Sequence, residues 1–320
     1  MARHSFIAGT GAYLPECIVT NDELARSVDT NDAWIHDRTG IRQRHIAGPR
    51  ETCAHMGAAA ARAALCQAGA EPGEVDAVIL ATSTPDQAFP ATALRVQAEL
   101  GIANGFGFDL AAACSGFIYG LSVADGMIRT GQVRSALVIG SEVYSRIMDW
   151  HDRTTCVLFG DGAGAVFLRA TEEPDRGVLS THLHAQGGLG DILYVDGAVG
   201  RHDRPGTLVM NGREVFRHAV TRLVETVEEA LAANRLTHDA VDWLVPHQAN
   251  RRIIDAVARK LGMNAERVVV TVDRHANTSA ASIPLALAEA VGDGRIRRGD
   301  LVLMEALGGG LTWGSALARF

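Results

Sequence analysis

The sequence VDAVILATS at residues 75–83 returns in the second half of the chain as VDWLVPHQ at residues 241–248. Both runs are short and almost entirely apolar, which is typical of strands that are buried on both faces. Each run is followed by an amphipathic stretch of helical period that ends in Leu-Gly, at residues 100–101 and at residues 261–262. Because strands that alternate with helices form βαβ units, these segments predict an α/β protein whose sheets are mostly parallel.

The likeness between the two halves continues beyond these strands. In each half we expect a further strand that leads into a turn of small residues, followed by a helix and an apolar strand. The matched segments are 108–109 with 272–273 for the expected strand, Cys114 with Asn277 for the turn, GQVR at 131–134 with GRIR at 294–297, and 136–140 with 301–303. Matched positions lie 161 to 166 residues apart. This order predicts two similar halves, residues 1–171 and 172–320, joined near the polar residues 171–177.

The bulk composition limits the classes of protein to which the chain can belong. Its formal charge of −7 over 320 residues argues against a nucleic-acid-binding protein. There is no signal-peptide core and no uninterrupted apolar stretch that could span a membrane. The five cysteines are odd in number and lack CxxC spacing, which argues against a disulfide framework or a cysteine-rich zinc site. We expect a soluble cytoplasmic protein without a bound metal.

Cys114 lies in AAACSG at residues 111–116, between a strand-like run and a predicted helix. Small neighbours leave room for a substrate carbonyl to approach the sulfur. The N-terminus of the helix should lower the pKa of the thiol and favour the thiolate. A buried cysteine that acts only as a small apolar side chain is the alternative.

The repeat predicts His247 and Asn277 as partners of Cys114. Equivalent turns of two similar halves should meet near the pseudo-twofold axis, and active sites of α/β folds gather at the carboxyl ends of strands. A Cys-His-Asn set suits acyl transfer, with an acyl thioester on the cysteine and with His and Asn donating hydrogen bonds to a second thioester carbonyl as a carboxylate departs. For Asn277 the alternative is a cap on the helix that follows it.

These residues resemble the β-ketoacyl-acyl-carrier-protein synthase III family, the initiating condensing enzymes of type II fatty acid synthesis, which have a thiolase-like fold. The likeness covers essentially the whole chain. It rests on AAACSG at 111–116, VPHQAN at 245–250, DRHANTSAA at 273–281 and GGGLTWG at 308–314. The resemblance implies a pseudo-duplicated five-layer αβαβα architecture with two mixed, mostly parallel sheets.

The resemblance also implies a role for each residue of the candidate site. Cys114 is the acylated nucleophile, His247 and Asn277 assist decarboxylation, and the backbone N–H groups of Cys114 and Gly309 form an oxyanion hole. A tight turn is the alternative for the glycine triplet. Contacts with coenzyme A are implied for Trp34, Arg38, Thr39, Arg153, Arg213, Asn250 and Arg252.

Two partners are implied in the same way. The acyl primer pocket is lined by Phe89, Tyr144, Phe159 and Leu307, and Phe89 reaches it across the interface of a homodimer. An acidic acyl carrier protein docks on Arg251, Arg252, Arg259 and Lys260. A solvated helix face on which Asp255 pairs with Arg251 or Arg259 is the alternative to the docking site.

The chain departs from the family pattern at four positions. Arg213 replaces an amide, Thr154 a glycine, Leu307 a phenylalanine, and Tyr144 a smaller aliphatic residue of the primer pocket. These departures leave open the length of the primer and whether the extender is bound to carrier protein or to coenzyme A.

The predicted reaction is a decarboxylative Claisen condensation of acetyl-CoA, or another short acyl-CoA, with malonyl-acyl-carrier protein. It requires no metal or organic cofactor, since coenzyme A thioester is a substrate. One alternative is a related acyltransferase or condensing enzyme of specialised polyketide- or quinolone-type metabolism with a different primer. A cysteine hydrolase that uses Cys, His and Asn and a catalytically silent scaffold are further alternatives.

Overall fold

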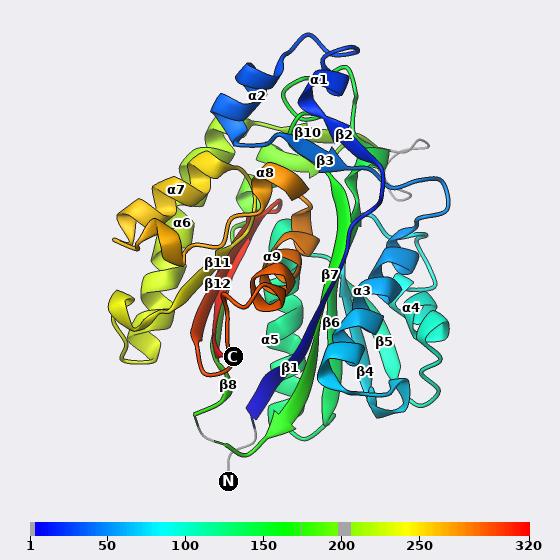
Figure 1. The fold of residues 1–320 in the computed structure, drawn as a ribbon, viewed down its shortest axis with the longest axis vertical. Coiled ribbons are helices and arrows are strands. Elements are labelled where there is room, and N and C mark those ends of the chain that lie inside the picture. The colour runs from blue at the N-terminus through cyan, green and yellow to red at the C-terminus, as the bar shows by residue number, and fades with distance from the viewer. Residues whose placement is uncertain (1–3, 174, 198–205) are drawn as a thin grey trace.

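The computed structural model describes residues 4–173, 175–197 and 206–320, and its elements form alternating layers of helix and sheet (Figure 1). The first large sheet has the strand order β1 (His4–Tyr13), β7 (Asp161–Thr171), β6 (Ser135–Val143), β4 (Ala77–Ala81) and β5 (Phe106–Leu110). The second has the order β11 (Trp243–Pro246), β12 (Leu301–Gly308), β13 (Thr312–Arg319) and β8 (Gly177–Ala185). Outside these lie two short pairs, β2 (Ile18–Thr20) with β3 (Gln43–His45) and β9 (Leu193–Val195) with β10 (Leu208–Met210).

Helices cover both faces of each large sheet. Figure 1 shows α3 (Cys53–Ala68) and α4 (Thr92–Leu100) on the outer face of the first sheet, α5 (Gly116–Arg129) and α9 (Ser282–Gly292) between the sheets, and α6 (Gly212–Ala233) with α7 (Arg251–Lys260) outside the second. Three short helices, α1 (Asn21–Leu24), α2 (Asp32–Thr39) and α8 (Val272–His275), lie toward the upper end of that view. The predicted αβαβα architecture is confirmed.

Both large sheets are mixed, as predicted, but parallel pairs are not the majority. β4 pairs in parallel with β5 and β6, and β11 with β12, whereas the other four pairings are antiparallel. The antiparallel strands β1, β7, β8 and β13 lie outside the segments that the repeat matches, so the βαβ argument does not reach them. The predicted junction at residues 171–177 falls between the end of β7 and the start of β8.

The strand expected at residues 272–273 is not formed, and this expectation is wrong. The short helix α8 takes its place, and pairing with β11 is limited to an isolated bridge at Val268. The backbone N–H groups of Thr271 and Val272 donate to the side-chain oxygen of Gln248, at 2.8 and 3.1 Å, rather than to a neighbouring strand. A buried side chain therefore replaces the sheet as hydrogen-bond acceptor and turns the backbone.

Apolar side chains fill the spaces between the layers. The central cluster joins α5 and α9 to the inner faces of both sheets, with Phe117, Ile283 and Met304 among its fully buried members. Two further clusters lie beneath the outer helices on either side. In the described part of the chain, no helix has the length and apolarity that a membrane span requires.

Glu305 is a carboxylic acid within this apolar surrounding, on β12. Its side chain is 1% exposed, and its Oε2 has no hydrogen-bond partner among the described residues. Burial raises the pKa of Glu305 well above its usual value. The folded chain therefore keeps this carboxyl neutral at pH values where the unfolded chain ionises it.

We expect Glu305→Gln to remove a pH-dependent loss of stability. In the unfolded chain the carboxyl ionises near its ordinary pKa of about 4.3. Because the folded pKa is raised, the wild-type free energy of unfolding falls as the pH rises from that value toward the folded pKa. The fall amounts to about 1.4 kcal/mol for each unit by which the pKa is raised. Urea unfolding at about pH 5 and about pH 8 measures this difference. The free energy of unfolding of the variant, relative to that of the wild type, should be higher at about pH 8.

The exposed Glu266 provides the matched control, since Glu266→Gln makes the same chemical change on the surface. An equal pH dependence of stability in wild type and Glu305→Gln would contradict the assignment of a neutral buried carboxyl.

Candidate active site

Cys114, His247 and Asn277 come from three separate elements and line one cavity of about 440 Å³. Cys114 lies in the turn between β5 and α5, His247 directly follows β11, and Asn277 lies two residues beyond the end of the short helix α8. Their exposed fractions are 4, 5 and 6%, so all three are largely withdrawn from water. The structure thus brings together the set that the repeat and the motifs predict.

The Cys114 turn is held by a close approach between the two halves. At Gly308, on β12, an added Cβ would lie 2.6 Å from the backbone nitrogen of Cys114, so no larger residue fits there. On the other side, the Ser115 hydroxyl donates to Ala112 O at 2.8 Å. Ala113 has a φ of 45°, in the left-handed region that non-glycine residues rarely adopt. The nucleophile turn is therefore strained and tightly enclosed.

The ionisation of Cys114 differs from the expectation. Burial raises the pKa of Cys114 to about 12, the nearby Ser279 hydroxyl acts against the rise, and the charge of Glu142 adds to it. The resting group at neutral pH is the thiol and not the thiolate, so the expectation of a lowered pKa is wrong. Loss of hydration destabilises the thiolate more than the helix N-terminus stabilises it, since α5 itself begins only at Gly116.

His247 is neutral at physiological pH for the same reason. Burial lowers the pKa of His247 to about 3. Its Nδ1 lies 2.6 Å from the hydroxyl oxygen of Ser282, at the start of α9. A neutral imidazole retains one N–H group, which makes it a hydrogen-bond donor without a positive charge.

Asn277 is not the N-cap residue of either helical element that follows it, because the 3-10 turn Ser279–Ala281 is preceded by Thr278 and α9 by Ala281, neither with a side-chain cap. Its side-chain oxygen accepts instead from the backbone N–H of Ser279 at 2.9 Å. Its backbone pairs with the segment around Phe159, donating to Leu158 O and accepting from Gly160 N. Since Oδ1 is occupied, Nδ2 is the group left to donate, and it has no partner among the described residues.

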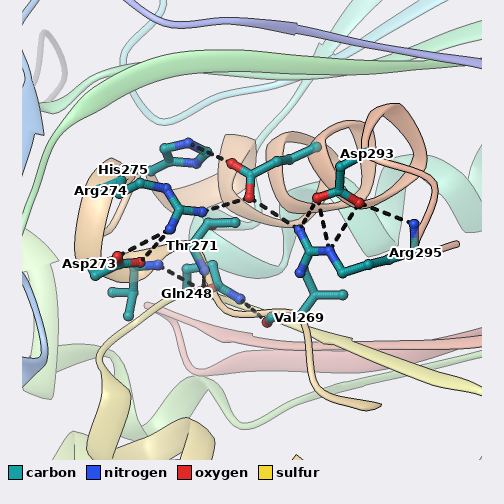
Figure 2. Close-up of polar contacts among 10 residues, drawn as sticks. Gln248, Val269, Thr271, Asp273, Arg274, His275, Asp293 and Arg295 are labelled. Atoms are coloured by element: carbon teal, nitrogen blue, oxygen red, sulfur yellow. Dashed lines mark hydrogen bonds and ion pairs between the residues drawn. The ribbon is translucent and has the colours of Figure 1, made fainter. Parts of the chain in front are cut away.

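The turn that leads to Asn277 is held from two sides, as Figure 2 shows. On one side the Gln248 side chain donates to Val269 O at 3.1 Å, and its oxygen accepts from the backbone N–H groups of Thr271 and Val272 (Figure 2). It also donates to Pro246 O at 2.8 Å. Its carboxamide is thereby fully used. On the other side Glu289, on α9, binds Arg274 at 2.6 Å and His275 at 3.3 Å.

Gln248, Glu289, Ser279 and Ser282 support the site although no function was predicted for them. Gln248 and Ser279 lie inside the quoted motifs, at 245–250 and 273–281, and Ser282 directly follows the second, so the motifs were the available signal. The contacts themselves join residues that are distant in the chain, and nothing in the local pattern indicates them.

Five of the seven residues predicted to contact coenzyme A line the cavity, namely Trp34, Arg38, Thr39, Arg153 and Asn250. The guanidinium carbons of Arg38 and Arg153 lie 4.5 and 5.4 Å from the centre of a Trp34 ring. Arg153 also pairs with Asp29 at 3.2 Å. Arg213 and Arg252 are not part of the lining.

The inner part of the cavity is aromatic. Tyr144, Phe159 and Leu307 line it, and the rings of Tyr144 and Phe159 are stacked with centres 4.9 Å apart. Phe89, predicted to reach the pocket of a second copy of the chain, is 84% exposed and does not line the cavity of its own chain, so its role stays a prediction.

The basic residues of α7 lie on its exposed face. Arg251, Arg252, Arg259 and Lys260 are all exposed. Arg251 pairs with Asp255 at 2.7 Å, as the alternative interpretation foresaw, while Arg252, Arg259 and Lys260 have no ion pair among the described residues. Within the same residues, no group of three or more His, Cys, Asp and Glu side chains is arranged to hold a metal ion.

Comparisons with known proteins identify the family to which the chain belongs. Residues 108–187 match the family 3-oxoacyl-[acyl-carrier-protein (ACP)] synthase III, and residues 231–320 match its C-terminal family. The chain is 70% identical over 319 residues to a β-ketoacyl-[acyl-carrier-protein] synthase III of Acidiphilium cryptum, covering 99% of this chain and 100% of the relative. It is 65% identical over 320 residues to the enzyme of the same name from Granulibacter bethesdensis, covering 99% of both.

A solved structure shows the same architecture. The 3-oxoacyl-[acyl-carrier-protein] synthase III of Aquifex aeolicus superposes with a TM-score of 0.94 at 47% identity, over 99% of this chain and 100% of that one. By its full-length identity to named relatives, its fold and its motifs, the chain belongs to the β-ketoacyl-acyl-carrier-protein synthase III family.

Proposed function

We propose that this chain condenses acetyl-CoA, or another short acyl-CoA, with malonyl-acyl-carrier protein and thereby initiates type II fatty acid synthesis. The observation that carries the proposal is the convergence of Cys114, His247 and Asn277 on one enclosed cavity. Curated relatives at 57 to 70% identity over nearly the whole chain all bear the synthase III name. These names favour the fatty acid enzyme over a synthase of specialised metabolism.

In the first step the sulfur of Cys114 attacks the acetyl thioester. A carbon–sulfur bond forms to Cys114, the bond to the coenzyme A sulfur breaks, and the cysteine proton leaves with coenzyme A as its thiol. One thiol is consumed and another is formed, so the exchange needs no net proton. Because the pKa of Cys114 is about 12, loss of its proton has to accompany the attack. The backbone N–H groups of Cys114 and Gly309 would hold the oxyanion, and the position of Gly309 on the cavity supports this.

In the second step the malonyl group loses CO₂ and forms an enolate. Neutral His247 and Nδ2 of Asn277 would donate hydrogen bonds to the thioester carbonyl as its oxygen gains charge. Donors that are fixed before reaction contribute roughly 2.7–4 kcal/mol each to such stabilisation. The enolate carbon then attacks the acetyl carbonyl, the bond to Cys114 breaks, and the released thiolate takes up a proton. Neither a metal nor an organic cofactor enters this sequence.

Coenzyme A would enter past Trp34. Indole and guanidinium faces stack well on an adenine ring, and Trp34, Arg38 and Arg153 already lie together at the cavity. Thr39 and Asn250 would contact coenzyme A farther into the cavity. Arg213 and Arg252, which lie outside the lining, would reach only its outer phosphates.

Two macromolecular partners belong to the proposal. Within the described residues the edge strand β5 pairs with β4 alone, and Phe106 on this strand is 41% exposed, while Leu94 and Phe89 are 38 and 84% exposed. A second copy of the chain would cover this edge and take Phe89 into its own primer pocket. The unpaired cations of α7 would attract the acidic carrier protein.

A cytoplasmic location is also part of the proposal. All five cysteines are free thiols, including the exposed Cys17 and Cys66. Unpaired exposed thiols are typical of a reducing compartment.

Replacement of the nucleophile tests the proposal directly. We expect the wild type to gain one acetyl group from acetyl-CoA and Cys114→Ala to gain none, because the acyl thioester forms only there. Intact-protein mass spectrometry measures the adduct, and formation of acetoacetyl-carrier protein measures condensation. Cys66→Ala, at an exposed thiol, should behave as the wild type. Retention of condensation in Cys114→Ala would refute the proposal.

The size of the primer should depend on Tyr144. Because its ring closes the inner cavity against Phe159, Tyr144→Leu should admit longer chains. A pocket that gains or loses a methylene-sized space changes specificity by about 10- to 200-fold. We therefore expect the acylation rate with hexanoyl-CoA, relative to acetyl-CoA, to rise at least about tenfold.

The matched control is Tyr194→Leu, which changes a partly exposed tyrosine of the same cavity. An unchanged preference in Tyr144→Leu, with Tyr194→Leu also unchanged, would show that other residues limit the primer.

A further inference from the structure

Ser282 is the first residue of α9, and its hydroxyl makes two contacts with the loop that carries His247. Its oxygen lies 2.6 Å from His247 Nδ1 and accepts from the backbone N–H of Gln248 at 3.3 Å. Ser282 is 2% exposed. Among the described residues, these are the only hydrogen-bond partners of this hydroxyl.

The two contacts determine where the hydrogen atoms lie. The Gln248 N–H can only donate, so it occupies a lone pair of the Ser282 oxygen. If Nδ1 of His247 also carried a hydrogen, the oxygen would accept twice and the serine hydrogen would be buried without an acceptor, which is unfavourable. If the serine donates to Nδ1 instead, every group of the three is satisfied. The single hydrogen of the neutral imidazole then resides on Nε2.

The absence of a carboxylate strengthens this assignment. A histidine that acts as a base commonly donates Nδ1–H to a carboxylate, which stabilises the imidazolium once it forms. Within the described residues, His247 has no ion-pair partner, and burial is the cause of its lowered pKa. A neutral hydroxyl offers an imidazolium little stabilisation, so the residue stays a neutral donor.

We infer that Ser282 is a positioning residue that holds His247 in the Nε2–H tautomer, so that the imidazole donates a hydrogen bond to the malonyl thioester carbonyl instead of accepting a proton. The inference rests on the proposed role of His247 in decarboxylation. In that case α9 positions both His247, through Ser282, and the turn ahead of Asn277, through Glu289 (Figure 2).

Two partial reactions separate this role from a structural one. Release of labelled CO₂ from malonyl-carrier protein reports decarboxylation, and acetyl transfer from acetyl-CoA to Cys114 reports the first step. Ser282→Ala should slow decarboxylation by about 100-fold, comparable to the loss of one fixed donor, and should leave acetyl transfer nearly unchanged. Ser282→Thr, which keeps a hydroxyl, should recover most of the lost rate.

Ser135 supplies the matched control. It is also buried, and its hydroxyl likewise accepts from one backbone N–H, that of Asp76, and donates to a carbonyl, that of Glu74. Since it lies at the start of β6 and outside the cavity lining, Ser135→Ala should leave both partial reactions unchanged.

The tautomer can be observed directly. In protein labelled with ¹⁵N-histidine, the imidazole shifts of His247, assigned by their loss in His247→Ala, distinguish Nε2–H from Nδ1–H. We expect Nε2–H in the wild type and in Ser282→Thr, and a mixture or Nδ1–H in Ser282→Ala. Because the wild-type spectrum is informative by itself, the test survives a poorly folded alanine variant.

Two results would overturn the inference: Nδ1–H in the wild type, or full decarboxylation with retained Nε2–H in Ser282→Ala. The proposed role of His247 is tested separately, by decarboxylation in His247→Ala. Loss there with no effect at Ser282 would reject the serine's role and keep the proposed function. Retention there would instead reject the role proposed for His247.

Discussion

Exclusion of water from the meeting point of the two halves is the constraint on which the site depends. The same burial raises the pKa of Cys114 and lowers that of His247, so both groups are uncharged at rest. An ion pair of thiolate and imidazolium would have to lose its hydration at a high cost in free energy. Two neutral groups avoid this cost. In a dry cavity, fixed dipoles act more strongly on the charge that develops during reaction. The site therefore acts through hydrogen-bond donors in fixed positions and not through groups that are charged before the reaction.

Much of the fold could be predicted because the chain repeats itself. The short apolar runs that became β4 and β11 and the amphipathic helix α7 were readable from periodicity, and the motifs identified Cys114, His247 and Asn277. The strand expected before Asn277 was not formed, because one side chain, Gln248, takes the backbone hydrogen bonds that a neighbouring strand would have taken. Periodicity describes apolar faces and carries no information about such a competing acceptor.

The properties of the site that were missed share one cause. Whether a helix N-terminus lowers a thiol pKa depends on how much water remains around the sulfur, and the Cys114 turn is packed against residues far along the chain, Gly308 among them. The contact between Ser282 and His247 likewise joins residues on different elements. Sequence motifs name the participants, whereas burial and long-range contacts set their chemical state.

The close approach of Gly308 to Cys114 bears on how the protein is made. Synthesis proceeds from the N-terminus, so the cysteine leaves the ribosome long before the strand that encloses it. Until β12 docks, Gly308 cannot close over the turn that carries the thiol. The docking of this strand therefore changes which electrophiles reach the sulfur, because in the complete fold they have to fit the cavity that Cys114 lines.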